Sequence, residues 1–414
     1  MPLFPSLHRI IPYSTFLLCF IATPLLAQEP VSSNQPETPV EPQSFAQCVV
    51  GLQQRALKSG ISANTVEQVL GQARHLAKIL EYDRNQPEFV QTFPGYYSAR
   101  VNDWRINKGR EMLAKHRDFL AKLSKEYGVP GHYLVAFWGL ETNFGNYKGK
   151  MPIIDSLATL ACDERRSQYF SAELLQALRL LEREQLNVID MVGSWAGAMG
   201  HTQFMPTAYL TYARDGDGDG KMDLWSSELD ALASAANFLK ALGWQAGYRW
   251  GREVQLPANF DYQLAGKSKP QPLSFWREQG LSTTANKQLE NSDLAAALLI
   301  PAGHEGPAFL AYQNFKVILR WNNSEYYGIA VGQLADQIAG GAGLSKPLPD
   351  LPKYTLAQMQ QFQQKLNELG FDVGKPDGIL GPATRTGVRA FQSAKNLIAD
   401  GYPSKETVEL ALQM

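Results

Sequence analysis

The stretch YLVAFWGLETNFG, residues 133–145, decides the fold of this chain. Residues 133–140 are apolar on every side of a helix, whereas a surface helix keeps its apolar residues on one face. We therefore expect a helix that is buried all round. Glu141 follows the apolar run directly, and Gly145 is placed to end the helix just beyond it. The sequence thus predicts a buried helix that carries one carboxyl group at its C-terminal end.

Three effects on the carboxyl group of Glu141 are expected to act in the same direction. Burial disfavours the charged form, and the negative end of the helix dipole disfavours it again. The preceding turns contain no Arg or Lys that would offset either effect. A raised pKa would keep Glu141 protonated near neutral pH, as general-acid protonation of a leaving oxygen requires. A structural glutamate capped by backbone amides is the alternative.

Helical patterns continue on both sides of this stretch, starting at Phe45. They are expected at roughly 46–58, 63–71, 108–127, 166–186, 228–242 and 325–338. Between about 250 and 320, runs such as EVQLP, AALLIPA and FKVILRW have the composition of strands and are separated by Gly, Pro and Asn. The predicted fold class is therefore α+β and predominantly α, with a small β-containing subdomain in a domain of residues 45–338.

The composition of the 414-residue chain excludes several classes of function. Hydrophobic residues make up 44% and charged residues 19%, which is typical of a folded globular protein. The 39 Lys+Arg and 40 Asp+Glu residues give a net charge of −1, so nucleic acid is not an expected partner. The sequence contains no HExxH, GxSxG or P-loop motif, and we expect no organic cofactor.

The N-terminal segment indicates where the protein resides. Residues 1–27 combine Arg9 with an apolar run that is too short for a membrane-spanning helix, which predicts a signal peptide. Residues 28–44, rich in Pro, Glu and Ser, predict a tether. The mature protein is then expected to be soluble and periplasmic. Its cysteines, Cys48 and Cys162, form a disulfide or remain two separate buried thiols.

A second domain follows a linker at 339–353 that is dense in Gly and Pro. Residues 354–414 show apolar positions at helical spacing, then DGILGPAT at 377–384 and a second Asp-Gly turn at 400–401. This segment resembles the peptidoglycan-binding domain that is attached to many wall enzymes. The resemblance implies a three-helix module that binds peptidoglycan. A generic helical bundle with regular caps is the alternative.

Two further blocks have the chemistry of a ligand groove. The first, SWAGAMGHTQFMPTAY at 194–209, has small residues that let backbone approach a ligand, with Ser194 and Gln203 placed to line it. The second, RWNNSEYYGIAV at 320–331, offers hydrogen bonds from Asn322 and Tyr327 beside aromatic faces. Taken alone, each block is more typical of an ordinary polar loop than of a ligand-binding site.

Together with residues 141–145, these blocks resemble the lytic murein transglycosylase B family, in order and over residues 45–338. The resemblance implies a lysozyme-like core that cleaves peptidoglycan between N-acetylmuramic acid and N-acetylglucosamine, with a 1,6-anhydromuramoyl product. It also implies that Glu141 is the single acid/base. The implied sugar contacts are Ser194, Gln203, Asn322 and Tyr327.

The loop DGDGDGK, residues 215–221, follows the start of the EF-hand calcium pattern. Position 12 of that pattern, normally glutamate, is Ser226 here. The transglycosylase resemblance implies a longer loop with a late closing aspartate and nominates Asp230. The predicted ligands of a structural Ca²⁺ are Asp215, Asp217, Asp219, the backbone carbonyl of Lys221, and Asp230. A solvated acidic turn is the alternative.

Two rival functions remain open from the sequence. A hydrolytic muramidase would need a second carboxylate, for which Asp155, Asp163 and Asp190 are candidates. A wall-binding scaffold without catalysis would need none. The expected partners are peptidoglycan glycan strands, with other cell-wall enzymes as candidates.

Overall fold

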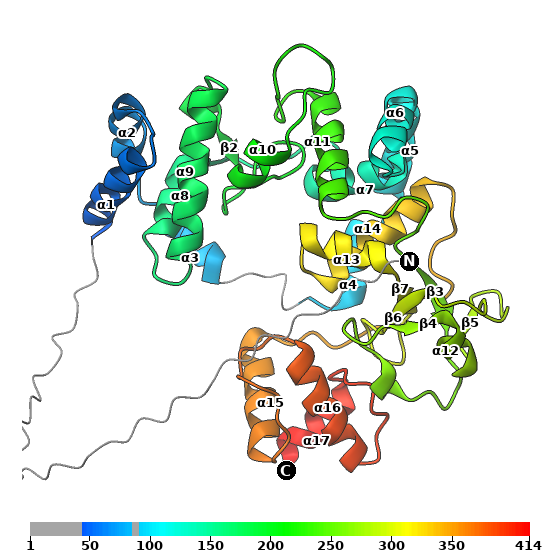
Figure 1. The fold of residues 1–414 in the computed structure, drawn as a ribbon. Coiled ribbons are helices and arrows are strands. Elements are labelled where there is room, and N and C mark those ends of the chain that lie inside the picture. Colours follow the sequence, from blue (N-terminus) through cyan, green and yellow to red (C-terminus); the bar gives the residue numbers. More distant parts are fainter. Residues whose placement is uncertain (1–43, 85–90) are drawn as a thin grey trace, which may run out of the picture. The chain divides into compact units, whose positions relative to one another are not determined.

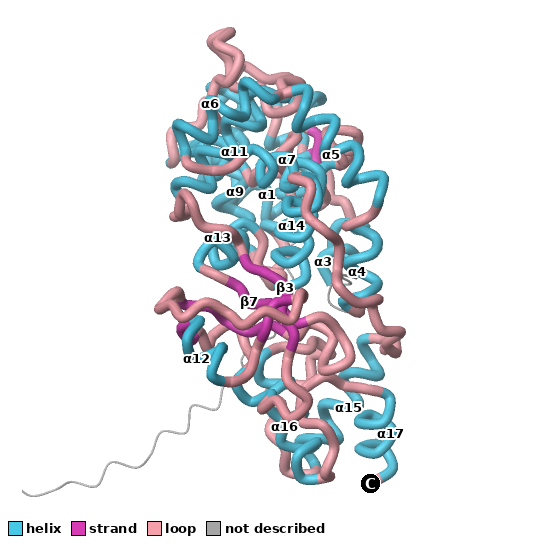
Figure 2. The backbone as a smooth tube through the Cα atoms, turned by 90° about the vertical axis from the view of Figure 1, so that its right-hand side faces the viewer, coloured by secondary structure: helices cyan, strands magenta, loops and turns pink. Residues whose placement is uncertain are grey.

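The structure is a computed structural model that describes residues 44–84 and 91–414. The predicted signal peptide, and the predicted tether up to residue 43, lie outside the described residues. Helices predominate, and most of the strands gather in one region, residues 251–311 (Figures 1 and 2). The predicted fold class, α+β with helices predominating, is confirmed.

The described residues form the following elements. The α-helices are α1 (Phe45–Lys58), α2 (Ala63–Gln68), α3 (Ala77–Arg84), α4 (Phe93–Arg100), α5 (Asp103–Lys115), α6 (Arg117–Tyr127), α7 (Gly131–Thr142), α8 (Ile153–Ala161), α9 (Ser167–Arg183), α10 (Pro206–Tyr212), α11 (Glu228–Ala241), α12 (Leu273–Glu278), α13 (Gln313–Trp321), α14 (Glu325–Ile338), α15 (Leu356–Glu368), α16 (Pro382–Ala394) and α17 (Lys405–Gln413). Short 3₁₀ helices lie at Leu70–Gln72, Val188–Asp190 and Tyr262–Leu264. The strands are β1 (Met151–Pro152), β2 (Val192–Gly193), β3 (Gly251–Gln255), β4 (Gln271–Pro272), β5 (Ser282–Thr283), β6 (Ala295–Leu299) and β7 (Ala308–Ala311).

Helix α7 lies in the middle of the main hydrophobic core, as the apolar run predicted. Every residue from Tyr133 to Gly139 is buried, and α7 contacts α5, α6, α11 and α14. The helix ends at Thr142, just beyond Glu141 as expected. The residue that ends it is Asn143, in a left-handed conformation with φ 50°, and not Gly145. The ring of Phe144 then folds back over Gly139, where a Cβ would lie 2.7 Å from Phe144 Cζ.

A second core cluster is built mainly from α1, α8, α9 and α10. The Cys48–Cys162 disulfide joins α1 to the residue that follows α8 and spans 114 residues of sequence. Of the two alternatives for the cysteines, the structure therefore shows the disulfide. The long helix expected at 108–127 is interrupted, because His116 leaves helical geometry between α5 and α6. The ring of His116 is instead held by Glu228, with 2.9 Å between Nε2 and Oε2.

The expected β region forms an antiparallel sheet with strand order β4-β6-β7-β3-β5. Its register pairs Gly251 with Ala311 across β3 and β7. One expectation for this region was wrong: FKVILRW belongs to helix α13, not to a strand. Phe315 and Ile318 are buried at helical spacing, so tertiary packing overrides the β propensity of the β-branched and aromatic residues.

The C-terminal segment forms the expected three helices, α15, α16 and α17, after the chain leaves α14. They enclose a core of their own, which consists of Met359, Phe362, Leu366, Val373, Val388, Phe391, Val408 and Ala411. We call residues 354–414 the C-terminal module. It also contacts the rest of the protein, because Tyr402 is only 6% exposed and belongs to the main core cluster around α7.

Candidate active site

Glu141 lies in the last turn of α7 and is half-buried. Its carboxylate accepts a hydrogen bond from the hydroxyl of Tyr327, although the two residues are 186 positions apart in the chain. Tyr327 is 4% exposed and sits in the first turn of α14, where Ser324 caps the helix by accepting from the Tyr327 N–H at 3.3 Å. The fold thus brings together two of the residues that the sequence singled out.

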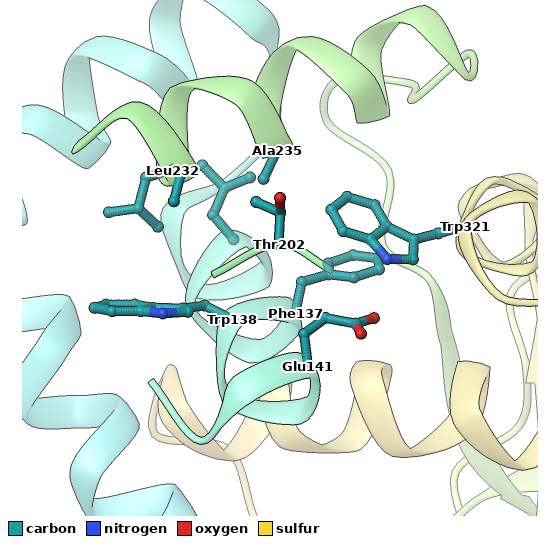
Figure 3. A pocket seen from close by; sticks show the side chains of 9 residues that line it. Phe137, Trp138, Glu141, Thr202, Leu232, Ala235 and Trp321 are labelled. Atoms are coloured by element: carbon teal, nitrogen blue, oxygen red, sulfur yellow. The ribbon is translucent and has the colours of Figure 1, made fainter. Parts of the chain in front are cut away.

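The side of Glu141 that faces the core is apolar. Phe137 and Trp321 lie with ring centroids 4.5 Å apart, and both line a small cavity together with Glu141 and Thr202 (Figure 3). The volume of this cavity is about 10 Å³, which is room for one water at most and not for a sugar ring. The cavity is therefore part of the apolar packing around Glu141 and not a sugar-binding site. Apolar surroundings of this kind strengthen charge interactions at the carboxyl group.

Arg105 of α5 holds the C-terminal end of α7, and sequence reasoning missed it. The residue is 9% exposed, and it donates from Nε to the Gly139 carbonyl at 3.1 Å and from Nη2 to Asn143 Oδ1 at 2.5 Å. Burial, and then the charge of Arg100, lowers the pKa of Arg105 from its usual value. The turns before Glu141 contain no Arg or Lys, as the sequence shows, but Arg105 brings a cation to the end of α7 from another helix.

His201 connects the loop at 193–204 to α7. Its Nδ1 accepts a hydrogen bond from the Trp138 indole N–H at 2.9 Å, and its carbonyl accepts from the Thr142 hydroxyl at 3.1 Å. Burial, and then the charge of Lys148, lowers the pKa of His201 to about 4, so the ring is neutral near pH 7. The ring fills the space beside Gly145, where a Cβ would lie 2.2 Å from His201 Cε1.

Ser194 and Gln203 belong to the same loop, and their side chains hold its backbone. Ser194 Oγ accepts from the N–H groups of Ala196 and Ala198 at 3.3 and 3.0 Å. Gln203 Nε2 donates to the carbonyls of Gly200 and Lys148 at 2.9 and 3.1 Å. Since Lys148 follows the end of α7, Gln203 is a second link between this loop and the segment that carries Glu141.

Asn322, the fourth predicted sugar contact, follows α13 directly and ends it. Its Oδ1 accepts from the Ser324 N–H at 3.1 Å, in the short turn that leads to Tyr327. Asn322 also lines a larger groove that extends toward the C-terminal module. Asn322 therefore belongs both to the turn that leads to Tyr327 and to the lining of that groove.

The acidic loop before α11 brings three predicted metal ligands together. Carboxylate oxygens of Asp215, Asp217 and Asp230 all lie within 4.8 Å of one another. Asp230 is 1% exposed, and burial, more than any other influence, raises its pKa. Asp219 falls outside this group, and its Oδ1 accepts from the Lys221 N–H at 2.8 Å. The backbone carbonyl of Lys221 as a ligand stays a prediction.

Several loop amides already bond to these carboxylates, which fixes their positions. Asp230 accepts from the N–H groups of Gly216 and Asp223 at 2.8 and 2.7 Å, so the late aspartate reaches back to the start of the loop. Clustered carboxylate oxygens are the ligands that Ca²⁺ prefers. The donor set therefore fits a hard divalent cation.

The three aspartates that could supply the second carboxylate of a hydrolase have other surroundings. Asp155 accepts from Arg74 Nε at 2.9 Å and forms an ion pair with its Nη2 at 2.8 Å. Asp163 pairs with Arg84 at 2.7 Å. Asp190 is exposed and is the last residue of the 3₁₀ helix at 188–190. The described contacts of these aspartates thus give none of them a bond to Glu141.

Comparison with known families gives the class of protein that this fold and site define. The chain belongs to the transglycosylase SLT domain family, which matches residues 44–336. Residues 355–410 match a peptidoglycan binding domain. The resemblance seen in the sequence is thereby confirmed, and the chain is an enzyme of this family.

The most similar proteins narrow the class further. Membrane-bound lytic murein transglycosylase B of Escherichia coli (strain K12) is 32% identical over 298 residues, which is 68% of this chain and 80% of that protein. SltB3 of Pseudomonas aeruginosa, solved in complex with NAG-anhNAM-pentapeptide, is 42% identical, with a TM-score of 0.84 over 89% of this chain and 100% of that chain.

The E. coli lytic transglycosylase Slt35, solved in complex with calcium, is 32% identical to this chain. Its TM-score is 0.62, and the match covers 72% of this chain and 93% of that chain. The lysozyme-like core expected from the sequence is shared with these structures. Within residues 44–84 and 91–414, no helix is both long and apolar enough to cross a membrane.

Proposed function

We propose that this protein is a periplasmic lytic transglycosylase that cleaves the β-1,4 bond between N-acetylmuramic acid and N-acetylglucosamine in peptidoglycan. The product is a 1,6-anhydromuramoyl end. The observation that carries the proposal is Glu141, a single carboxyl group at the end of a buried helix and bonded to Tyr327. Membership of the transglycosylase family and the relatives' activity on murein support the choice of substrate.

The reaction needs one carboxyl group because the nucleophile is already part of the substrate. Glu141 gives its proton to the glycosidic oxygen, and the bond from C1 of the muramoyl residue to that oxygen breaks. The C6 hydroxyl of the same sugar then bonds to C1, and the Glu141 carboxylate takes the hydroxyl proton. Since the attacking group is held within one molecule, the step gains effective molarity without a second enzyme carboxylate.

We assign the predicted sugar contacts to two segments that are linked to the C-terminal end of α7. Ser194 and Gln203 come from the loop that His201 attaches to α7, and Asn322 and Tyr327 come from the α13–α14 junction. We assign them to holding the muramoyl ring while water is excluded. Tyr327 also orients the Glu141 carboxylate through its hydroxyl.

We further propose that Asp215, Asp217 and Asp230 hold a structural Ca²⁺. Bound Ca²⁺ would neutralise the clustered carboxylates, whose mutual repulsion otherwise opposes folding of the loop. The calcium complex of Slt35 supports this choice of ion. In the same way, the matched peptidoglycan binding domain supports a wall-anchoring role for the C-terminal module.

Digestion of purified peptidoglycan with product identification by mass spectrometry tests the proposal. The parent should release 1,6-anhydro ends even in abundant water. Glu141→Gln should lose turnover by at least the ~10²–10⁴-fold that general acid–base catalysis contributes. Asp190→Asn, the same carboxyl-to-amide change at an exposed site, should remain active. Reducing ends as the main product would identify a hydrolase instead, and full activity of Glu141→Gln would favour a binding scaffold.

A further inference from the structure

A groove of about 610 Å³ lies between the C-terminal module and the rest of the protein. One wall consists of the loop at 265–269 and the α13–α14 junction at 322–326, and the other consists of module residues from the start of α16 and from 402–403. This groove is far larger than the cavity beside Glu141. It has room for part of a polymer, whereas the smaller cavity does not.

The module side of this groove is fixed by specific contacts. Asp400 accepts from the His304 N–H at 2.8 Å and pairs with His304 Nδ1 at 2.6 Å. Gly303 has φ 68°, and a Cβ there would lie 2.5 Å from Asp400 Oδ2. Tyr402, buried in the main core, adds an apolar anchor two residues later. The groove is therefore bounded by packed surfaces on both sides.

The charge of the groove is strongly asymmetric. Four cationic side chains line it, Lys267 and Lys269 from the loop and Arg385 and Arg389 from α16, against one carboxylate, Glu325. The Arg389 Nε–H is buried and has no hydrogen-bond partner among the described residues. Burial, and then the charge of Arg385, lowers the pKa of Arg389, whereas the charges of Asp400 and Asp261 act in the opposite direction. The groove thus matches an anionic ligand.

The position of the groove indicates which part of the substrate supplies that anion. Asn322 and Ser324 line the groove, and Ser324 also caps the turn that holds Tyr327 against Glu141. Because Asn322 is also a proposed sugar contact, we take the occupant of the groove to be part of the same molecule as the sugars at Glu141. The glycan backbone of N-acetylated sugars is uncharged, whereas a peptide joined to the muramoyl group through its N-terminus ends in a carboxylate.

We propose that this groove binds the anionic stem peptide of a muramoyl residue in the strand being cleaved, so that the enzyme prefers peptide-bearing glycan. The inference rests on the proposed function and adds to it a preference within the substrate class. Lys269 and Arg385, one from each wall, contact the carboxylates of the peptide. The C-terminal module then takes part in substrate selection as well as in anchoring.

The test compares peptide-bearing strands with the same strands after removal of their peptides. The measured quantity is the ratio of kcat/KM for the two substrates. Neutralising one cation on each wall, in Lys269→Gln/Arg385→Gln, should lower this ratio about tenfold, as expected for the loss of two partly screened ion pairs. Raising the salt concentration should lower the ratio for the parent but barely change it for the double variant.

Two controls separate charge at this site from other effects. Lys269→Arg/Arg385→Lys keeps both charges and should retain most of the parent's ratio, which also shows that a fall in the neutral variant is not caused by damaged packing. Lys287→Gln removes an exposed lysine from the same subdomain but outside the groove, and should leave the ratio unchanged. An unchanged ratio in the neutral variant, or an equal fall in the charge-retaining one, overturns the inference.

The same assay distinguishes failure of this inference from failure of the proposed function. If the parent releases anhydro product from peptide-free strands but the ratio does not respond to the variants, only the groove assignment fails. If the parent releases anhydro product from neither substrate, the proposed function itself fails.

Discussion

Replacing Arg105 with methionine should destabilise the C-terminal end of α7, because it removes the charged group that holds this end in place. The substitution keeps much of the apolar stem but removes the donors to the Gly139 carbonyl and to Asn143 Oδ1. It also removes the Nη1 donor to the carbonyls of Ala99 and Arg100. Each hydrogen bond to a charged group contributes ~1.5–3 kcal/mol, so losing the two at the end of α7 should by itself cost about 3–6 kcal/mol. The protein should still fold, since domains are stable by roughly 5–15 kcal/mol.

The activity of the folded protein should fall as well, because Glu141 lies two residues beyond Gly139. A misplacement of about 1 Å at a reacting group can cost ~10²-fold in rate. We therefore expect kcat/KM for peptidoglycan fragments to fall about 100-fold at a temperature at which the variant is fully folded. Denaturant unfolding gives the stability, and turnover per folded molecule gives the activity.

Two variants show whether the geometry of the arginine matters. Arg105→Lys keeps the charge but cannot reach both acceptors at once, so it should fall between the parent and Arg105→Met. Arg110→Met removes an exposed arginine from the same helix, one that donates to the Gln337 carbonyl at 2.8 Å, and should change stability by under about 1 kcal/mol. Normal turnover by folded Arg105→Met would refute the positioning role, whatever its stability.

Further predictions concern the disulfide, His201 and the metal loop. Reduction of Cys48–Cys162, or its replacement by two alanines, should lower the unfolding free energy by ~2–5 kcal/mol in denaturant titrations, since the bond closes a 114-residue separation. Burial lowers the pKa of His201 to about 4, below the unfolded value of ~6.5, so the unfolded state binds more protons as pH falls from 6.5 to 4. Stability should decrease across that window, and His201→Gln should show a flatter profile; an unaltered slope would contradict this. Ca²⁺ at a hundredfold excess over Kd should stabilise the parent by ~2.7 kcal/mol in thermal unfolding, and Asp230→Asn should abolish the shift while Asp261→Asn, outside the loop, keeps it.

The parts of the fold that could be predicted are those written in local sequence. The apolar run at 133–140 has no polar face, so its burial follows from the side chains alone. The three helices of the C-terminal module follow from spacing and from Gly381-Pro382 at the start of α16. By contrast, α13 could not be predicted from FKVILRW, because its helical state depends on residues distant in sequence, such as Trp250, whose ring lies 6.0 Å from Phe315.

The same distinction applies to the site. Glu141 is identifiable because the residues that bury it are its own neighbours in the helix. Arg105 is not, since it comes from a different helix and lies among the many charged residues of the chain, with no local pattern to mark it. Asp230 could be nominated only through the family resemblance, because Ser226 occupies the position at which an EF-hand pattern would close.

The position of Glu141 is set by elements other than its own helix, and the proposed chemistry explains why that matters. Arg105 of α5 holds the end of α7, the Thr142 hydroxyl bonds to the loop at 193–204, and Tyr327 of α14 bonds to the carboxylate. In an enzyme with two catalytic carboxyl groups, one can act as the general acid and the other as the general base. A single carboxyl group must first reach the glycosidic oxygen and then the C6 hydroxyl of the same sugar, so an error in its position affects both proton transfers. Support from three separate elements reduces that error at the one residue that has no substitute.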